Sequence, residues 1–273
     1  MPPQALPSLR DTRKRRPGVE VLNEYLYRPL AQLLVPALSK AGIAPESVVL
    51  FHTALGLLAA WQVSRGGRLA PALLLQVKTV LDNADGQLAR ATGRTSLLGR
   101  YLDSEMDLLV NAALLFAIDR RLGAPALVTL QLILTADYLL EKAYREARGE
   151  TFRETPAQGS DGALLATLRG AYDVFFLPQE KLLSRLFEAR FQAVGGTDAD
   201  RAAYAPRPVT HLAANLGLST QLALAGICLA LGRPGVYLAC LPVQALALVG
   251  AQLGREYGVK QKQASGRTSW KNR

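Results

Sequence analysis

The sequence predicts an all-α integral membrane protein with six transmembrane helices and an N-terminal interfacial amphipathic helix. Three stretches, residues 47–64, 209–232 and 234–254, contain no Asp, Glu, Lys or Arg. Each approaches the ~20 residues that an α-helix needs to cross a bilayer core. The charges gather elsewhere, because residues 13–16 are all basic and residues 255–273 contain six basic residues against one acid. This distribution indicates membrane helices between basic segments, although 49% hydrophobic residues and a net charge of +10 alone also fit a soluble protein.

Composition excludes several other classes of protein. An apolar content of 49% is too high for an intrinsically disordered chain. Two cysteines are too few for a disulfide scaffold. A basic chain favours acidic partners such as nucleic acid, an anionic membrane surface or phosphorylated substrates. Because the basic tail directly follows an apolar helix, we expect it to contact anionic membrane lipids, and we expect no nucleic-acid partner.

The N-terminal region is predicted to have two parts. Residues 1–18 are polar, Pro-rich and basic, which is typical of a disordered arm. Residues 19–41 carry apolar side chains at helical spacing, with Glu20, Glu24 and Arg28 on the other face. This pattern indicates an amphipathic helix lying in the membrane interface, and an ordinary core-facing helix fits the periodicity equally well.

The six membrane helices are predicted within one domain, residues 42–256. Four of them precede a polar cytoplasmic insertion, residues 149–208, which contains an amphipathic segment at residues 172–191. Two more follow it, and residues 257–273 form a basic cytoplasmic tail. The predicted spans are Glu46–Ser64, Leu69–Thr92, Leu97–Arg120, Ala124–Arg148, Val209–Leu231 and Pro234–Gly254.

Loop charges predict the orientation in the membrane. The N-terminal arm, the turn between the second and third spans, the insertion and the C-terminal tail fall on one side and are rich in Lys and Arg. Basic loops of membrane proteins stay in the cytoplasm. We therefore expect an integral protein of the cell inner membrane, with both termini and the active site cytoplasmic.

The second and third spans carry carboxylates where a membrane helix should have none. Asp82 and Asp85 are three residues apart, and Asp103 and Asp107 are four apart, so each pair lies on one helical face. A turn near residues 92–96 brings the two helices back to back, and the four carboxylates converge. Divalent cations would relieve their repulsion, and hard oxygen ligands suit Mg²⁺ or Mn²⁺. Two such ions are the usual device for displacement at a phosphoryl group.

The neighbouring residues suit a bulky diphosphate ligand. Gly86 and Ala89 clear the helix face beside the acids, so a ligand can approach closely. Arg90 lies on the same face and offers a bidentate fork to phosphate. Ser96 and Gly99 lie on the matching face of the third span.

These residues together resemble the signature of a known family. The string Asp82-x2-Asp85-Gly86-x2-Ala89-Arg90-x8-Gly99-x3-Asp103-x3-Asp107 is similar to that of the CDP-alcohol phosphotransferase (CDP-alcohol phosphatidyltransferase) family, with all eight fixed positions at the right gaps. The plan of six membrane helices behind an amphipathic helix also resembles this family. The motif covers 26 residues.

The resemblance implies a membrane enzyme of phospholipid biosynthesis. Such enzymes transfer a phosphatidyl group from a CDP-lipid such as CDP-diacylglycerol to a polar alcohol and release CMP. By position, Asp82 and Asp103 would bridge two Mg²⁺ or Mn²⁺ ions, Asp85 would hold the first, and Asp107 would hold the second and serve as general base. Arg90 is expected to act in catalysis, and a homodimer is expected. The residues expected at the CDP moiety are Gly86, Ala89, Arg90, Ser96, Pro45, Glu46 and Ser47.

The sequence gives less information about the acceptor alcohol than about the metals and the CDP-lipid. Lys142 and Arg145 are candidates for holding an acceptor phosphate, and ordinary positive charge at a cytoplasmic helix end explains them equally well. The expected acceptor is of the glycerol phosphate, inositol or inositol phosphate type. His52 and His211 are isolated, and we interpret both as hydrogen-bonded helix residues and not as metal ligands.

Two alternatives remain open at this point. A soluble CDP-aminoalcohol could donate its headgroup to diacylglycerol, and a panel of CDP donors separates this reaction from the first. The chain could also be a non-catalytic membrane protein that binds cations or lipids, although loss of an acid would then be expected and all four are present.

Overall fold

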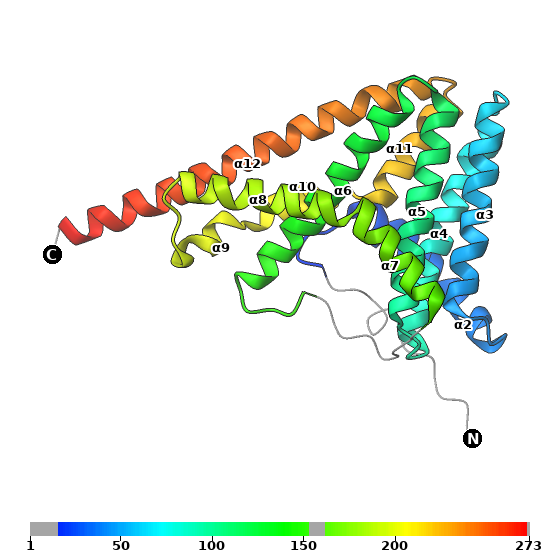
Figure 1. Ribbon diagram of the computed structural model, residues 1–273, viewed down its shortest axis with the longest axis horizontal. Coiled ribbons are helices and arrows are strands. Elements are labelled where there is room, and N and C mark those ends of the chain that lie inside the picture. The colour runs from blue at the N-terminus through cyan, green and yellow to red at the C-terminus, as the bar shows by residue number, and fades with distance from the viewer. Residues whose placement is uncertain (1–15, 153–161, 272–273) are drawn as a thin grey trace.

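The computed structural model describes residues 16–152 and 162–271, and within these ranges it contains helices and turns without any strand. The predicted all-α class is confirmed. Three long helices, α3 (Pro45–Ser64), α4 (Leu69–Ala91) and α5 (Leu97–Ile118), run side by side in Figure 1. α3 packs against both α4 and α5, so it forms the centre of this group.

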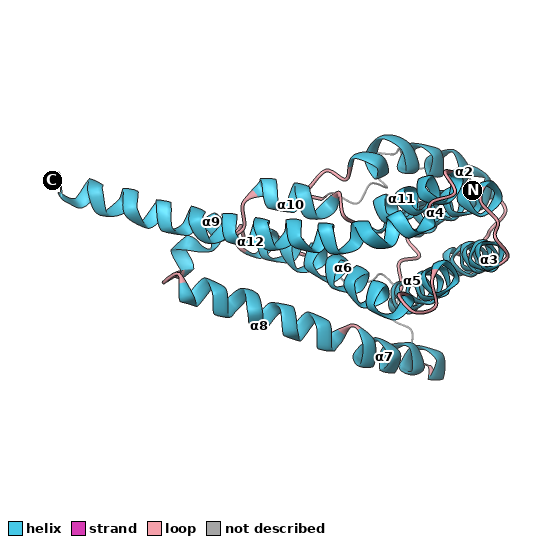
Figure 2. Cartoon of the chain, turned by 90° about the horizontal axis from the view of Figure 1, so that it is seen from above, coloured by secondary structure: helices cyan, strands magenta, loops and turns pink. Residues whose placement is uncertain are grey.

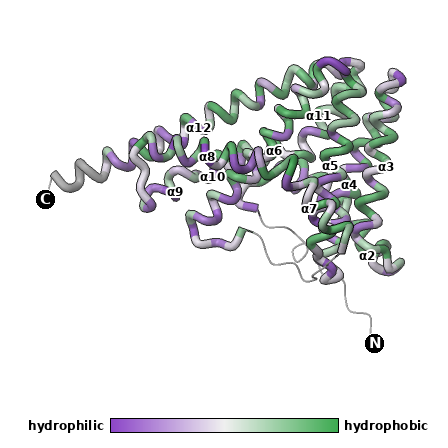
Figure 3. Tube along the Cα trace, in the orientation of Figure 1, coloured by the Kyte–Doolittle hydropathy of each residue, from purple (hydrophilic) through white to green (hydrophobic). Residues whose placement is uncertain are grey.

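α3 approaches α5 closely at a glycine. A Cβ atom added to Gly56 would lie 2.6 Å from Cγ1 of Val110, which is too close for a real contact. The missing side chain therefore sets the distance between the two helices. The main apolar core lies beyond this contact, and it joins α3–α6 to α11 (Leu218–Ala230) and the start of α12 (Pro234–Lys271). In Figure 3 the hydrophobic colouring follows the same helices.

The predicted N-terminal helix is present. A π-helical turn, η1 (Asn23–Tyr27), leads directly into α2 (Arg28–Lys40), which packs on α4. Val35 is fully buried on the inner side, whereas Tyr25 and Leu33 are 77% and 74% exposed on the outer side. The helix thus presents apolar side chains outward as well as inward, and its place in the membrane interface stays a prediction. The predicted basic arm, residues 1–18, lies almost entirely outside the described residues.

Three helices are long and apolar enough to cross a membrane: α3, α6 (Gly123–Glu146) and residues 234–265 of α12. A fourth span is formed if α10 (Arg207–Ala214) and α11 are counted as one broken helix. α4 and α5, the predicted spans that carry the acidic residues, do not meet this standard of apolarity because of their charges. The count of six spans therefore stays a prediction.

The fifth predicted span differs from expectation because it is broken, with a bend of 42° between α10 and α11. The N-terminal segment fills the break. Asn215 accepts a hydrogen bond from the Val21 backbone N–H (2.9 Å) and donates one to the Val19 carbonyl (2.7 Å). His211 accepts from the Val19 N–H (3.0 Å), so it is a hydrogen-bonded helix residue as predicted. Polar partners from outside the helix replace the lost helical bonds.

The polar insertion is largely helical in its described part. α7 (Ala163–Phe175) and α8 (Leu177–Ala193) follow each other and lie along the outer side of α5 and α6 in Figure 2. α8, with the last turn of α7, corresponds to the predicted amphipathic segment. A short helix, α9 (Arg201–Tyr204), then leads back to the membrane helices.

α12 continues well past its predicted end at Gly254. Its second half packs against the insertion, where Arg190 of α8 donates two hydrogen bonds to Glu256 (2.7 and 2.6 Å). Phe191, Tyr204 and Val259 form a small buried cluster beside this ion pair. The charges after residue 254 ended the predicted span, but in the structure they pair with the insertion and the helix goes on.

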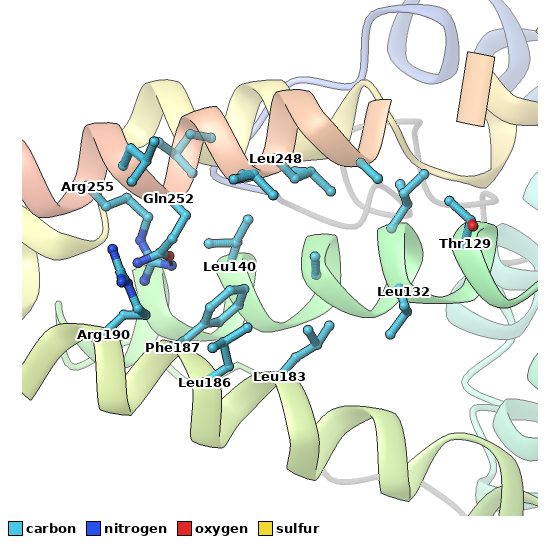
Figure 4. Close-up of a pocket in the computed structure, with 17 residues that line it drawn as sticks. Thr129, Leu132, Leu140, Leu183, Leu186, Phe187, Arg190, Leu248, Gln252 and Arg255 are labelled. Atoms are coloured by element: carbon cyan, nitrogen blue, oxygen red, sulfur yellow. Dashed lines mark hydrogen bonds between the residues drawn. The ribbon is translucent and has the colours of Figure 1, made fainter. Parts of the chain in front are cut away.

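An apolar cavity of about 530 Å³ lies between α6, α8 and α12 (Figure 4). Leu183 and Phe187 reach toward it from α8, and Arg190 and Arg255 lie together at one end. Among the described residues that line it, none comes from α4 or α5. This cavity is therefore separate from the acidic residues.

Candidate active site

The acidic residues lie where three helices meet. Four side chains, His52 of α3, Asp82 and Asp85 of α4 and Asp103 of α5, each offer one ligand atom, and these atoms all lie within 4.8 Å of one another. His52 Nε2 is 2.9 Å from Asp85 Oδ2 and 3.7 Å from Asp82 Oδ1. The predicted convergence of Asp82, Asp85 and Asp103 is therefore present in the structure.

The group fits a divalent cation by its chemistry. Three carboxylates and one imidazole are ligands that Mg²⁺ or Mn²⁺ accepts. Oδ1 of Asp103 is buried and has no hydrogen-bond partner among the described residues. A buried carboxylate oxygen without a partner is costly, and a bound cation would satisfy it.

Asp107, the fourth predicted carboxylate, lies next to this group and is held by a lysine. The fully buried Lys78 donates hydrogen bonds to Asp107 and to Asp82, the latter at 2.8 Å. One buried ammonium thus links a carboxylate of α4 to one of α5. Its charge balances part of the negative charge of the cluster.

The place of His52 in the candidate metal group was not predicted from the sequence. His52 is hydrogen-bonded, as predicted, but its partner is Asp85 and it belongs to the candidate metal group. Two signals were present in the sequence. An ionisable residue inside an otherwise uncharged span is a functional candidate by default. His52 also lies seven residues after Pro45, on the same face of α3.

A polar cavity of about 190 Å³ lies on one side of the carboxylates, and Asp85 and Asp103 line it. Six of the seven residues predicted at the CDP moiety also line it. Arg94 and Arg100 line it as well, although the sequence had marked them only as cytoplasmic charges. The six are Pro45, Glu46, Gly86, Ala89, Arg90 and Ser96, and the exception is Ser47.

Local structure shapes this cavity. Ser96 begins α5 as its N-cap, because its Oγ accepts a hydrogen bond from the Gly99 N–H (2.9 Å). The same hydroxyl donates to Glu46 (2.9 Å), which ties the start of α5 to the start of α3. A Cβ on Gly99 would lie 3.1 Å from Ser96 Oγ, so the glycine allows this contact. Three arginines in one small cavity suit a diphosphate.

A second polar cavity, of about 180 Å³, lies on the Asp107 side. Residues of α5, α6 and the α7–α8 insertion line it. The predicted acceptor-phosphate residues lie elsewhere: Lys142 is 3.8 Å from Glu146, and Arg145 donates to Glu141 (3.1 Å). Neither is among the described residues that line the two polar cavities.

Comparison with known proteins gives the same assignment as the motif. Residues 43–154 match the CDP-alcohol phosphatidyltransferase family, and this segment contains His52, Lys78 and all four aspartates. Residues 43–154 form a CDP-alcohol phosphatidyltransferase domain. The family uses divalent metal ions, in agreement with the cluster of His52 and three aspartates.

Three relatives are similar to part of this chain. Archaetidylinositol phosphate synthase of Pyrococcus horikoshii is 35% identical over 105 residues, which are 38% of this chain and 52% of the relative. Phosphatidylinositol phosphate synthase of Streptomyces avermitilis is 32% identical over 102 residues, 36% of this chain and 41% of the relative. Inner membrane protein YnjF of Escherichia coli is 35% identical over 89 residues, 33% of this chain and 43% of the relative.

The similarity is thus confined to part of each chain. The alignments span about half the length of these relatives or less. Residues after 154, which include the α7–α8 insertion and α10–α12, lie outside the family match. The described residues that line the arginine-containing cavity all fall within the matched segment. The cavity beside Asp107 is also lined by residues beyond that segment.

Proposed function

We propose that this chain is an integral membrane enzyme that transfers a phosphatidyl group from a CDP-lipid, such as CDP-diacylglycerol, to a polar alcohol with release of CMP. The acceptor class is glycerol phosphate, inositol or inositol phosphate. The observation that carries the proposal is the group of buried His52 and Asp85 with half-buried Asp82 and Asp103, beside a cavity that Arg90 lines. The printed names of two relatives, archaetidylinositol phosphate synthase and phosphatidylinositol phosphate synthase, support the same reaction class.

The metal ligands proposed are Asp82, Asp85, Asp103 and Asp107, with His52 beside them, for two Mg²⁺ or Mn²⁺ ions. When bound, such ions withdraw negative charge from a diphosphate and stabilise the departing CMP. The unpartnered oxygen of Asp103 supports this assignment.

The chain's own side chains have separate roles in this proposal. Arg90 orients the diphosphate through its planar guanidinium, which matches two phosphate oxygens at once. Ser96 and Glu46 hold the wall of the CDP cavity through their mutual hydrogen bond. Asp107 receives the proton of the acceptor hydroxyl on a carboxylate oxygen. Lys78 positions Asp107 and offsets its charge.

The proposed placement keeps six spans, with α4 and α5 among them. Charged residues inside a membrane are tolerated when they face the bundle interior and pair with one another, as Lys78 does with Asp82 and Asp107. Residues 42–256 form the proposed catalytic domain, residues 19–41 lie in the interface, and the site and both termini face the cytoplasm of the inner membrane. A homodimer is part of this proposal.

The test is CMP release by the purified full chain. Labelled CDP-diacylglycerol, Mg²⁺ or Mn²⁺ and a panel of alcohols should give CMP and a new lipid, and Asp82→Asn or Asp103→Asn should abolish both. Asp119→Asn is the matched control, since Asp119 directly follows α5 at the end far from the site and an Asn retains the oxygen that bonds the Arg121 N–H (2.7 Å). Full activity of either site variant, or turnover of CDP-ethanolamine with diacylglycerol instead, would contradict the proposal.

A further inference from the structure

The two polar cavities lie on different sides of the carboxylate cluster. Asp85 and Asp103 line the cavity with the arginines, whereas Asp107 lines the second cavity. In the proposed reaction the CDP donor occupies the first cavity, and the reacting alcohol must approach from elsewhere. The second cavity places a bound hydroxyl next to Asp107, the proposed base.

The second cavity is lined by buried neutral groups that suit hydroxyls. Asn111 is 3% exposed, and its Nδ2 has no hydrogen-bond partner among the described residues. Gln131 and Thr135 of α6 line the same cavity and are also buried. Amides and hydroxyls both donate and accept, as do the hydroxyls of a polyol. An unpartnered buried amide is the feature that a ligand hydroxyl would satisfy.

The charge of this cavity is the opposite of what a phosphate requires. The described residues that line it include the carboxylates of Asp107 and Glu180 and no Lys, Arg or His. A phosphorylated alcohol would face Asp107, whose charge the buried Lys78 offsets, and Glu180, and none of the described lining residues is a cation that could pair with the phosphate. The arginine-lined donor cavity shows how differently this chain builds a surface for phosphate.

The insertion closes the cavity. Tyr172 and Phe176 line it from the α7 side and Glu180 from α8, and Tyr172 donates a hydrogen bond to Glu180. Tyr172 also packs edge-on against Tyr101 of α5, with ring centroids 5.2 Å apart. Tyr172, Phe176 and Glu180 all lie outside the family match, so this wall belongs to the insertion.

We propose that the cavity beside Asp107 binds the acceptor alcohol, that the α7–α8 insertion forms its outer wall, and that the acceptor is an uncharged polyol and not a phosphorylated one. This inference rests on the proposed function. It separates the chain from the relatives named for archaetidylinositol phosphate and phosphatidylinositol phosphate, and the wall that carries Glu180 lies outside the family match. The unpartnered N–H of Asn111 needs a hydrogen-bond acceptor, which a hydroxyl oxygen offers and an ammonium group does not.

The first test is an acceptor panel with the full chain, CDP-diacylglycerol and Mg²⁺, and mass detection of the lipid product. We expect kcat/KM for inositol and glycerol to exceed that for inositol 1-phosphate, glycerol 3-phosphate and serine at least tenfold. Preference for a phosphorylated alcohol or for serine overturns this inference and leaves the proposed function standing. Absence of CMP release with every acceptor overturns both.

The second test changes the charge of the wall. Glu180→Lys should raise kcat/KM for inositol 1-phosphate relative to inositol at least tenfold, whereas Asp173→Lys, the same charge change on the exposed side of α7, should leave that ratio unchanged. Glu180→Gln should shift the ratio less but in the same direction. It provides the same test if Glu180→Lys fails to fold. Equal ratios in wild type and Glu180→Gln overturn the inference.

The third test removes the unpartnered amide. Asn111→Leu keeps the branching of the side chain at Cγ but removes its polar atoms, and it should raise KM for inositol about tenfold while kcat and the KM for CDP-diacylglycerol stay within twofold. Thermal stabilisation of the full chain by inositol without donor should fall in parallel, which gives a readout independent of turnover. An unchanged KM together with unchanged stabilisation would refute the role of Asn111.

Discussion

Lys78 offers a direct test of how the carboxylate cluster is stabilised. Its side chain is completely buried and bonds to Asp82 and Asp107, so Lys78→Met removes a buried cation and leaves two half-buried carboxylates without it. Breaking a buried ion pair in this way costs about 3–5 kcal/mol. For a chain of this size, each kcal/mol lowers Tm by about 2–4 °C, so we expect a fall of about 10 °C in EDTA.

The same substitution should be milder when divalent cations are present. Mg²⁺ or Mn²⁺ bound by Asp82 and its neighbours would supply the positive charge that Lys78 provided, so the loss in Tm should shrink to less than half. Lys142→Met is the control, because Lys142 is 42% exposed and its pairing with Glu146 contributes at most about 1 kcal/mol.

Thermal unfolding of detergent-solubilised protein, followed by tryptophan or scattering signals with EDTA or Mn²⁺, measures both effects. If Lys78→Met lowers Tm equally under the two conditions, the cluster does not bind a cation that can replace the lysine. If it lowers Tm no more than Lys142→Met does, the ion pairs of Lys78 do not stabilise the fold. Either result refutes the reasoning.

Three further perturbations follow from local contacts. Gly56→Ala should destabilise the chain by about 1–3 kcal/mol through its contact with Val110, and Gly250→Ala, which meets open space, should not; Tm values compare the two. Ser96→Ala removes the N-cap of α5 and the bond to Glu46, so it should cost about 1 kcal/mol and raise the KM for the CDP-lipid without changing that for the acceptor. Hydrogen bonds from Lys262, Gln263 and Thr197 lower the pKa of Asp200 in the folded chain, so its stabilisation is complete above about pH 4 and declines gradually as the pH falls toward that lowered pKa; Asp200→Asn should therefore lower Tm at pH 6 and lower it by less at pH 3.

The sequence predicted α3 to α6 to within about two residues at each end because their boundaries are marked locally. Pro45 begins α3, and Ser96 directly precedes α5. The acidic motif could also be predicted, since a three- or four-residue spacing places two carboxylates on one helical face. These features depend on neighbours in the chain, which a sequence displays directly.

What could not be predicted depends on partners that are distant in the chain. The continuation of α12 past Gly254 rests on the pairing of Glu256 with Arg190, 66 residues away. The break at Asn215 rests on bonds to Val19 and Val21, almost 200 residues earlier. The sequence predicted a basic tail after residue 256 and an unbroken span across Asn215, because a polar residue looks the same in sequence whether solvent or another segment of the chain satisfies it.

The division of the site between two parts of the chain has a consequence for specificity. Every residue named for the CDP moiety and the metals lies within residues 43–154, the segment that matches the family. The cavity beside Asp107 takes one wall from that domain, through Asn111 and Gln131, and the other from the insertion, through Tyr172 and Glu180. A donor common to the family needs a constant surface, whereas acceptors of different charge need different ones. Placing one acceptor wall outside the matched segment lets the acceptor change without disturbing the residues that hold the metals and the nucleotide.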